Sequence, residues 1–221
     1  MSEFDRIYQA YRHCEELVRV HDKDHFLASL FAPVDRRSYL SALYAFAFEI
    51  ARVKVLVNDP MAGTIRLQWW LEAIRGMRAG EAAASPVMIA LQDAAHQTDI
   101  SLMPLSAAVE ARQAELYGTP ALDAEAIVLV MAAGFLGEHD GAIKVAADLA
   151  AQAVTFTTSE PEKARAAYVA FRGEASKLPE HALPAFLTVS LVPIRLNRPD
   201  ASQWRKQIVL LRTAWFGFPK I

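Results

Sequence analysis

The chain contains very little cysteine, because Cys14 is the only one among its 221 residues. A single cysteine excludes an intramolecular disulfide framework and fits a reducing compartment. No histidine and acid can be placed beside it as a catalytic group. We therefore expect Cys14 to be a half-buried helix residue rather than a nucleophile.

A large net charge and long apolar runs are also missing. The formal net charge of −2 gives no electrostatic case for a nucleic-acid partner. The nearest candidate for a membrane span, residues 183–196, is interrupted by Pro184 and Pro193. The acidic amino terminus lacks the basic and then apolar pattern of an export signal. We expect a cytoplasmic protein with no transmembrane segment, and peripheral contact with a membrane stays open.

Strand-like alternation longer than four residues, internal repeats and low-complexity linkers are absent too. Apolar residues instead recur at three- and four-residue spacings, which predicts an all-α, single-domain helical bundle over residues 1–221. Prolines 179, 184 and 193 predict short, angled helices near the carboxyl end. The longer helices are expected over about residues 2–20, 36–57, 61–77, from 86 onward, 103–116, 122–136, 140–155, 160–176 and 200–215.

Local signals add detail to these helices. Ser2 is placed to cap the first helix, and Asp24 is placed to cap a short apolar turn at 26–31. The segment 21–25 has the residue types of a metal site but not the spacing, so a solvated turn is the favoured interpretation. The helix 36–57 is apolar over most of its circumference, which is typical of a central helix.

Several segments, in order and at compatible spacing, resemble the squalene/phytoene synthase family. Residues 31–46 contain a proline, an arginine soon after it and then Ala-Leu-Tyr-Ala-Phe, which is how the family's catalytic domain begins. Residues 66–76 resemble its next helix, and Ser85-Pro86-Val87 resembles its His-Pro-Val segment. The resemblance is specific over about residues 24–92, and it is weaker over 105–118 and 162–196.

The resemblance implies a type I isoprenoid synthase fold, in which two aspartate-rich motifs hold Mg²⁺ against a diphosphate leaving group. The positions of the first motif here read Ala51-Arg52-Val53-Lys54-Val55 and contain no acid. The second motif falls in residues 140–156, where Asp148 stands alone and a loop is missing, so the middle section is expected to be shortened. We therefore expect no catalytic residue, no metal and no cofactor.

Residues 46–54, the segment Arg66-Leu-Gln-Trp-Trp70 and residues 182–190 are similar to one branch of this family, the mitochondrial respiratory complex I assembly factors. That likeness implies a non-catalytic assembly or chaperone-like factor. Its partner would be a respiratory-complex subunit, or an apolar lipid or isoprenoid ligand in the helical cavity. The charges within 46–54 form either a remodelled polar site or side chains that reach solvent. The candidate cavity residues are Tyr44, Phe48, Glu49, Arg52, Arg66 and Trp69.

Trp69 and Trp70 point about 100° apart on their helix, so at most one of them lines a cavity together with Arg66. Packing in the core is the commoner role of a buried tryptophan. Glu72 and Arg75, three residues apart, are expected to form an ordinary ion pair on the helix surface.

Two alternatives remain open. The first is an active prenyl transferase that condenses isoprenoid diphosphates with Mg²⁺ held by acids from elsewhere, for which the candidates are Asp22, Asp24, Glu110 and Glu115. The second concerns the tail 204–218, which mixes aromatic and basic residues. This tail either closes the bundle as a docked helix, which we favour, or lies in a membrane interface.

Overall fold

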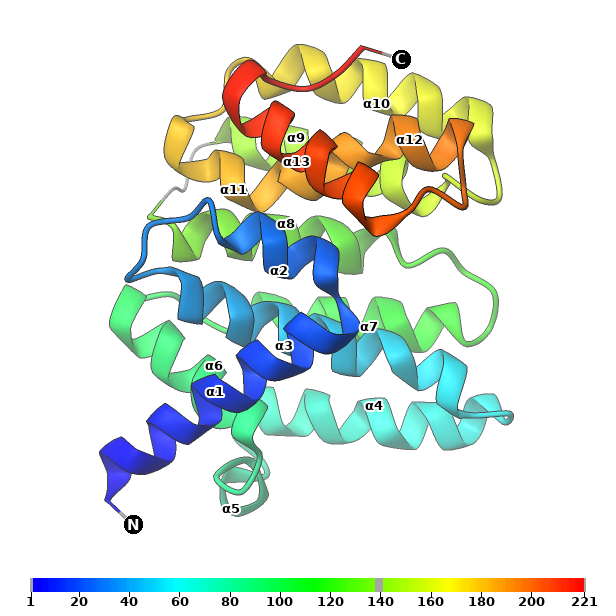
Figure 1. Cartoon of the computed structure of the whole chain (residues 1–221). Helices are drawn as coiled ribbons and strands as arrows, with labels where there is room; N and C mark the ends of the chain where they lie inside the picture. The colour runs from blue at the N-terminus through cyan, green and yellow to red at the C-terminus, as the bar shows by residue number, and fades with distance from the viewer. Residues whose placement is uncertain (1, 138–140, 221) are drawn as a thin grey trace.

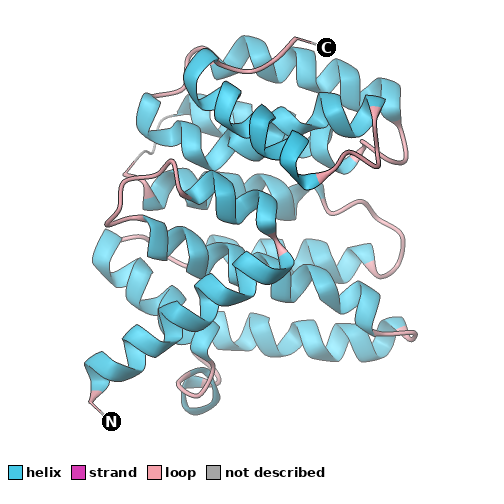
Figure 2. Cartoon of the chain, in the orientation of Figure 1, coloured by secondary structure: helices cyan, strands magenta, loops and turns pink. Residues whose placement is uncertain are grey.

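The computed structural model describes residues 2–137 and 141–220, and all regular secondary structure within these ranges is helical (Figures 1 and 2). This confirms the predicted all-α class. The longer helices are α1 (Glu3–His21), α3 (Arg37–Leu56), α4 (Pro60–Ile74), α6 (Pro86–Thr98), α7 (Pro104–Glu115), α8 (Leu122–Phe135), α9 (Gly141–Thr155), α10 (Pro161–Ala175) and α13 (Gln203–Phe216). The shorter elements are α2 (Lys23–Ser29), α5 (Ala79–Ala82), η1 (Glu180–Ala182), α11 (Leu183–Phe186), η2 (Leu187–Leu191) and α12 (Val192–Asn197).

Helices α1 and α6 begin at the side-chain caps and the proline that the sequence predicts. Ser2 and Asp5 form a capping box at the start of α1, in which each side chain accepts a hydrogen bond from the other residue's backbone N–H. Ser85 caps α6, with Pro86 at its first position, where the missing N–H costs nothing. The short helices after Pro179 also agree with the prediction. The expected start of a helix at Asp140 lies outside the described residues.

Three local predictions are wrong. The cap of α2 is Asp22, whose carboxylate accepts from the backbone N–H of His25, whereas Asp24 lies inside the helix and is 9% exposed. The segment 21–25 is therefore not a solvated turn, because Asp24 faces α12 and α13. Cys14 is completely buried rather than half-buried, and burial, together with the charge of Glu49, raises its pKa to about 12.

The bundle is organised around two buried helices. α3 contacts α1, α2, α4, α6, α7 and α8, and every residue from Leu40 to Phe46 is buried. This confirms its central position. α8 is buried on most sides as well, between α7 below and α9 above in the view of Figure 1. A second central helix at this position was not anticipated.

Alanines let the helices of the upper half approach closely. α9 packs on α10 and α8 mainly through small side chains such as Ala146, Ala150 and Ala153. Beside them, the buried ring of Phe171 contacts Phe186 and Phe218, which ties α10 to the carboxyl-terminal segments. α13 lies across η2 and α2 (Figure 1). Within the described ranges, no helix is both long enough and apolar enough to cross a bilayer.

Candidate functional site

Tyr44, Phe48 and Arg52 lie four residues apart along one side of α3. The ring of Phe48 stacks on that of His21 with 5.1 Å between centroids, and the guanidinium carbon of Arg52 is 5.5 Å from the centre of the Phe48 ring. Arg52 also bonds Glu49, with Nη2 2.8 Å from Oε2. The structure therefore places four of the six candidate residues on one stretch of α3, beside α1 and α2.

These four residues and the histidines beside them, His21 and His25, are called the Tyr44 group. Tyr44 is its deepest member. Its side chain is 1% exposed, and within the described ranges its hydroxyl has no hydrogen-bond partner. Its ring lies 4.4 Å from that of His25, whose Nδ1 is 2.7 Å from a carboxylate oxygen of Asp22. Burial, and secondarily the charge of Asp22, raises the pKa of Tyr44 above its usual range. The hydroxyl therefore stays protonated and free to donate to a ligand.

His25 is expected to make stability depend on pH. Burial opposes its positive charge, but the Asp22 carboxylate and the charge of Glu125 outweigh this, so the net effect is a raised pKa. The other charged group facing His25, Arg195, lowers its pKa. A histidine whose pKa is higher in the folded than in the unfolded state stabilises the folded chain. Its contribution is complete below the unfolded pKa of about 6.5 and is lost as pH rises through the folded pKa.

The measurement is the free energy of unfolding of the wild type and of His25→Gln at several pH values. The advantage of the wild type over the variant should shrink as pH rises from about 6.5. An advantage that is constant with pH would show that His25 is not protonated in the folded chain. His96→Gln, at an exposed position on α6, is the control for the loss of a histidine side chain.

A second group of charges joins α3, α7 and α8, and we call it the Arg112 network: Lys54, Arg112, Glu115 and Glu125. Arg112 Nη1 is 2.8 Å from Glu115, and its Nη2 bonds Glu125. Lys54 reaches Glu115 at 3.3 Å. Burial opposes the charge of Arg112, but Glu125 and Glu115 outweigh it and raise its pKa. Because Glu125 also acts on His25, the network and the Tyr44 group are electrostatic neighbours.

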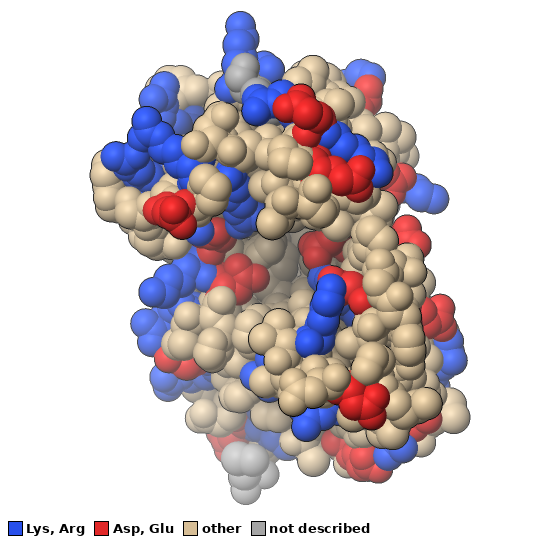
Figure 3. All heavy atoms as spheres, turned by 90° about the vertical axis from the view of Figure 1, so that its right-hand side faces the viewer, with Lys and Arg blue, Asp and Glu red and all other residues tan. Residues whose placement is uncertain are grey.

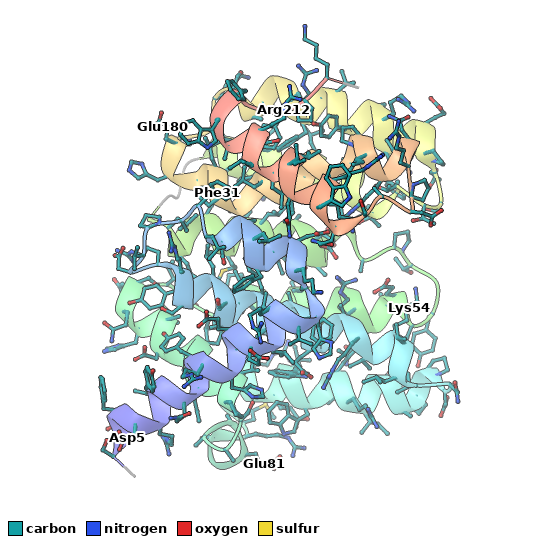
Figure 4. The ribbon with its side chains drawn as sticks, in the orientation of Figure 1. Asp5, Phe31, Lys54, Glu81, Glu180 and Arg212 are labelled. Atoms are coloured by element: carbon teal, nitrogen blue, oxygen red, sulfur yellow. The ribbon has the colours of Figure 1, made fainter. Side chains whose placement is uncertain are left out.

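Figure 3 shows a hollow between the upper and lower halves of the molecule, on the side that lies to the right in Figure 1. Acidic and basic side chains surround its opening. Lys54, which belongs to the Arg112 network, lies on this side of the molecule (Figure 4). The candidate site therefore consists of two electrostatically neighbouring groups, the Arg112 network and the Tyr44 group on α3, and Lys54 of the network lies on the side of the hollow.

The other two candidate residues lie on α4, away from the Tyr44 group. Arg66 is exposed, and Trp69 is partly buried with its indole N–H 2.7 Å from Glu81. Trp70 is the tryptophan that enters the core, edge-on to Phe46. Among the described residues, no hydrogen bond, ion pair or ring contact joins Arg66 or Trp69 to Glu49 or Arg52.

The acids on α4 and α7 pair differently from the prediction. Glu72 bonds Arg78 rather than Arg75, because the chain turns back after Ile74 and brings the next arginine close. Arg75 instead bonds Glu110, with Nη2 2.8 Å from the carboxylate. The expected Glu72–Arg75 pair was therefore wrong.

The carboxylates of the Arg112 network and of the Tyr44 group do not fit the magnesium site that an isoprenoid synthase fold implies. Mg²⁺ takes several oxygen ligands in octahedral geometry, which requires carboxylates that converge. Here Asp22 faces His25, Glu49 faces Arg52, and Glu115 and Glu125 share Arg112. Among the described residues, no three His, Cys, Asp or Glu side chains gather as metal ligands would.

Comparison with known families agrees with the fold. The family model described as squalene/phytoene synthase matches residues 18–129, which is about half of the chain and includes α3, α7 and the Arg112 network. The chain belongs to the squalene/phytoene synthase family.

Among curated proteins, the chain is similar to assembly factor 6 of NADH dehydrogenase (ubiquinone) complex I. The bovine protein is 30% identical over 105 residues, which cover 48% of this chain and 32% of the relative. The mouse and human proteins are each 32% identical over 104 residues, or 47% of this chain and 31% of the relative. The matched segment therefore spans about a third of these relatives. No solved structure matches the chain.

Proposed function

We propose that this chain is a non-catalytic member of its family that acts as an assembly factor for a respiratory NADH dehydrogenase complex. The likeness to complex I assembly factors carries this proposal. The partner would be a subunit of that complex, met in the cytoplasm or at a membrane surface.

The pairing of the acids supports a role without diphosphate chemistry. The alternative function, an active prenyl transferase, needs carboxylates that share a metal ion. The four acids available for that purpose are held apart in separate ion pairs: Asp22 with His25, Asp24 with Arg195, Glu110 with Arg75, and Glu115 with Arg112. These pairs orient the carboxylates toward four different cations rather than toward one shared metal ion.

The finer part of the proposal is an apolar lipid or isoprenoid ligand in the hollow. The buried, unpartnered hydroxyl of Tyr44 supports it, since a buried donor without a partner is costly and a ligand oxygen would satisfy it. Phe48, one turn further along α3, would offer an apolar ring, and Arg52 a cation next to that ring.

Release of pyrophosphate from farnesyl and geranylgeranyl diphosphate, with and without Mg²⁺, tests the non-catalytic part. We expect no turnover by purified chain that shows a full helical circular-dichroism signal. Turnover that requires Mg²⁺ would establish the prenyl transferase instead.

Extraction of the same preparation into organic solvent, followed by mass spectrometry, tests the proposed ligand. The absence of any co-purified lipid or isoprenoid counts against it.

A further inference from the structure

α13 buries only one of its sides. Leu210 and Thr213 are buried against η2 and α2. The opposite side carries an unbroken apolar stripe, because four large side chains follow one another at spacings of four, three and four residues. These residues and their exposed fractions are Trp204 (56%), Ile208 (46%), Leu211 (52%) and Trp215 (76%), and Phe216 (83%) extends the end of the stripe.

The charge around this stripe is mainly positive, although the exposed Asp200 lines a pocket together with Trp204 and Arg205. Residues 201–221 contain no Asp or Glu but include two lysines and two arginines. Arg205 and Arg212 are seven residues apart and therefore flank the stripe along the same edge. Of the two lysines, Lys206 turns inward to Asp24. Lys and Arg side chains gather on this end of the molecule, at the upper left of Figure 3.

A groove runs between α12 and α13 beside the stripe. Its volume is about 380 Å³, and its lining includes Pro193, Ile194, Trp204 and Ile208 together with the guanidinium-bearing Arg198 and Arg205. Apolar walls with two arginines among them match one acyl chain and a phosphate headgroup.

We propose that α13 docks on the surface of an anionic lipid bilayer, with its apolar stripe in the interface and Arg205 and Arg212 against lipid phosphates. Tryptophan and phenylalanine beside arginine are typical of helices that lie in a membrane interface. The excess of arginine over acid, with Arg198, Arg205 and Arg212 against Asp200, favours an anionic bilayer over a protein surface, which would need its own matching charges. This surface is distinct from the hollow, so the inference goes beyond the proposed function.

Co-sedimentation of the full chain with vesicles tests the proposal. One set of vesicles is pure phosphatidylcholine, and the other contains about one third phosphatidylglycerol. We expect binding to the anionic vesicles and little to the neutral ones. Reversing two charges in R205E/R212E should weaken binding at least about tenfold, since each basic residue near an anionic surface contributes measurably. W215S/F216S should weaken it severalfold.

Matched controls distinguish docking through α13 from nonspecific binding to vesicles and from unfolding. R6E/R12E makes the same charge change on the exposed side of α1, and F4S/Y8S removes two aromatics that are 78% and 53% exposed there. Both should bind as the wild type does, and all variants should keep its melting temperature. The proposal is overturned if the wild type binds neither vesicle, if it binds both equally, or if the α1 variants lose binding to the same extent.

Discussion

Replacing Arg112 with methionine is expected to lower the free energy of unfolding by about 3 kcal/mol. The arginine side chain is 13% exposed and holds two carboxylates, Glu115 and Glu125, which are 20% and 33% exposed. Without Arg112, Glu115 keeps Lys54, but Glu125 is left with its charge partly buried and no strong partner. An uncompensated charge in such a place costs far more than the loss of an exposed ion pair.

Chemical denaturation of the variant and two companions tests this explanation. R112M/E125M removes the stranded carboxylate as well, so it should recover a large part of the lost stability. Arg165→Met removes the arginine of a surface pair with Glu162, whose side chain is 92% exposed, and should change stability by less than about 0.5 kcal/mol. If R112M and Arg165→Met have equal effects, the Arg112 network does not bind α7 to α8.

The second large effect is expected at Asp24, where alanine should cost about 3 kcal/mol and loosen α13. The Asp24 carboxylate accepts hydrogen bonds from Arg195 at 3.0 Å and Gln203 at 2.9 Å, and Lys206 lies 3.5 Å away. Burial opposes its charge, yet these three partners together lower its pKa below the usual range. They come from α12 and α13, so one side chain of α2 holds the carboxyl-terminal helices in place.

Limited trypsin digestion measures the loosening, since Arg205 and Lys206 lie in the first turns of α13. Cleavage there should be markedly faster in Asp24→Ala than in the wild type, whereas Asp148→Ala, at an exposed position on α9, should behave as the wild type does. Because the pKa of Asp24 is lowered on folding, its contribution is present above about pH 4 and is lost as pH falls through the folded pKa. Equal cleavage of both variants would mean that α13 is held by its apolar contacts alone.

The fold could be predicted from the sequence because its signals are local. Caps such as Ser2 and Ser85, and prolines at the first helical position such as Pro86, each act within the first turn of the helix that begins there. The apolar circumference of α3 likewise identified its central position. The family likeness extended these local signals to a known arrangement of helices.

The site was only partly predictable, because its charges meet across long separations. Asp24 and Arg195 are 171 residues apart, and no local pattern distinguishes a capping aspartate from one that bonds a distant helix. For the same reason Arg112 was missed, because nothing in the polar sequence around it, Glu110 to Glu115, distinguishes a buried arginine from an exposed one. Tyr44, Phe48, Glu49 and Arg52 could be predicted to lie together because they share one stretch of a single helix, and their role as site residues stays a prediction.

The most direct test of the central claim is the amount of assembled NADH dehydrogenase complex in cells that have lost this chain. Native gel electrophoresis of their membranes, stained for NADH oxidation, measures it, with an unrelated respiratory complex as the loading control. We predict a severalfold loss of the assembled complex, with accumulation of partial assemblies, and full recovery when the wild-type chain is restored. An unchanged level of the assembled complex would contradict an assembly function.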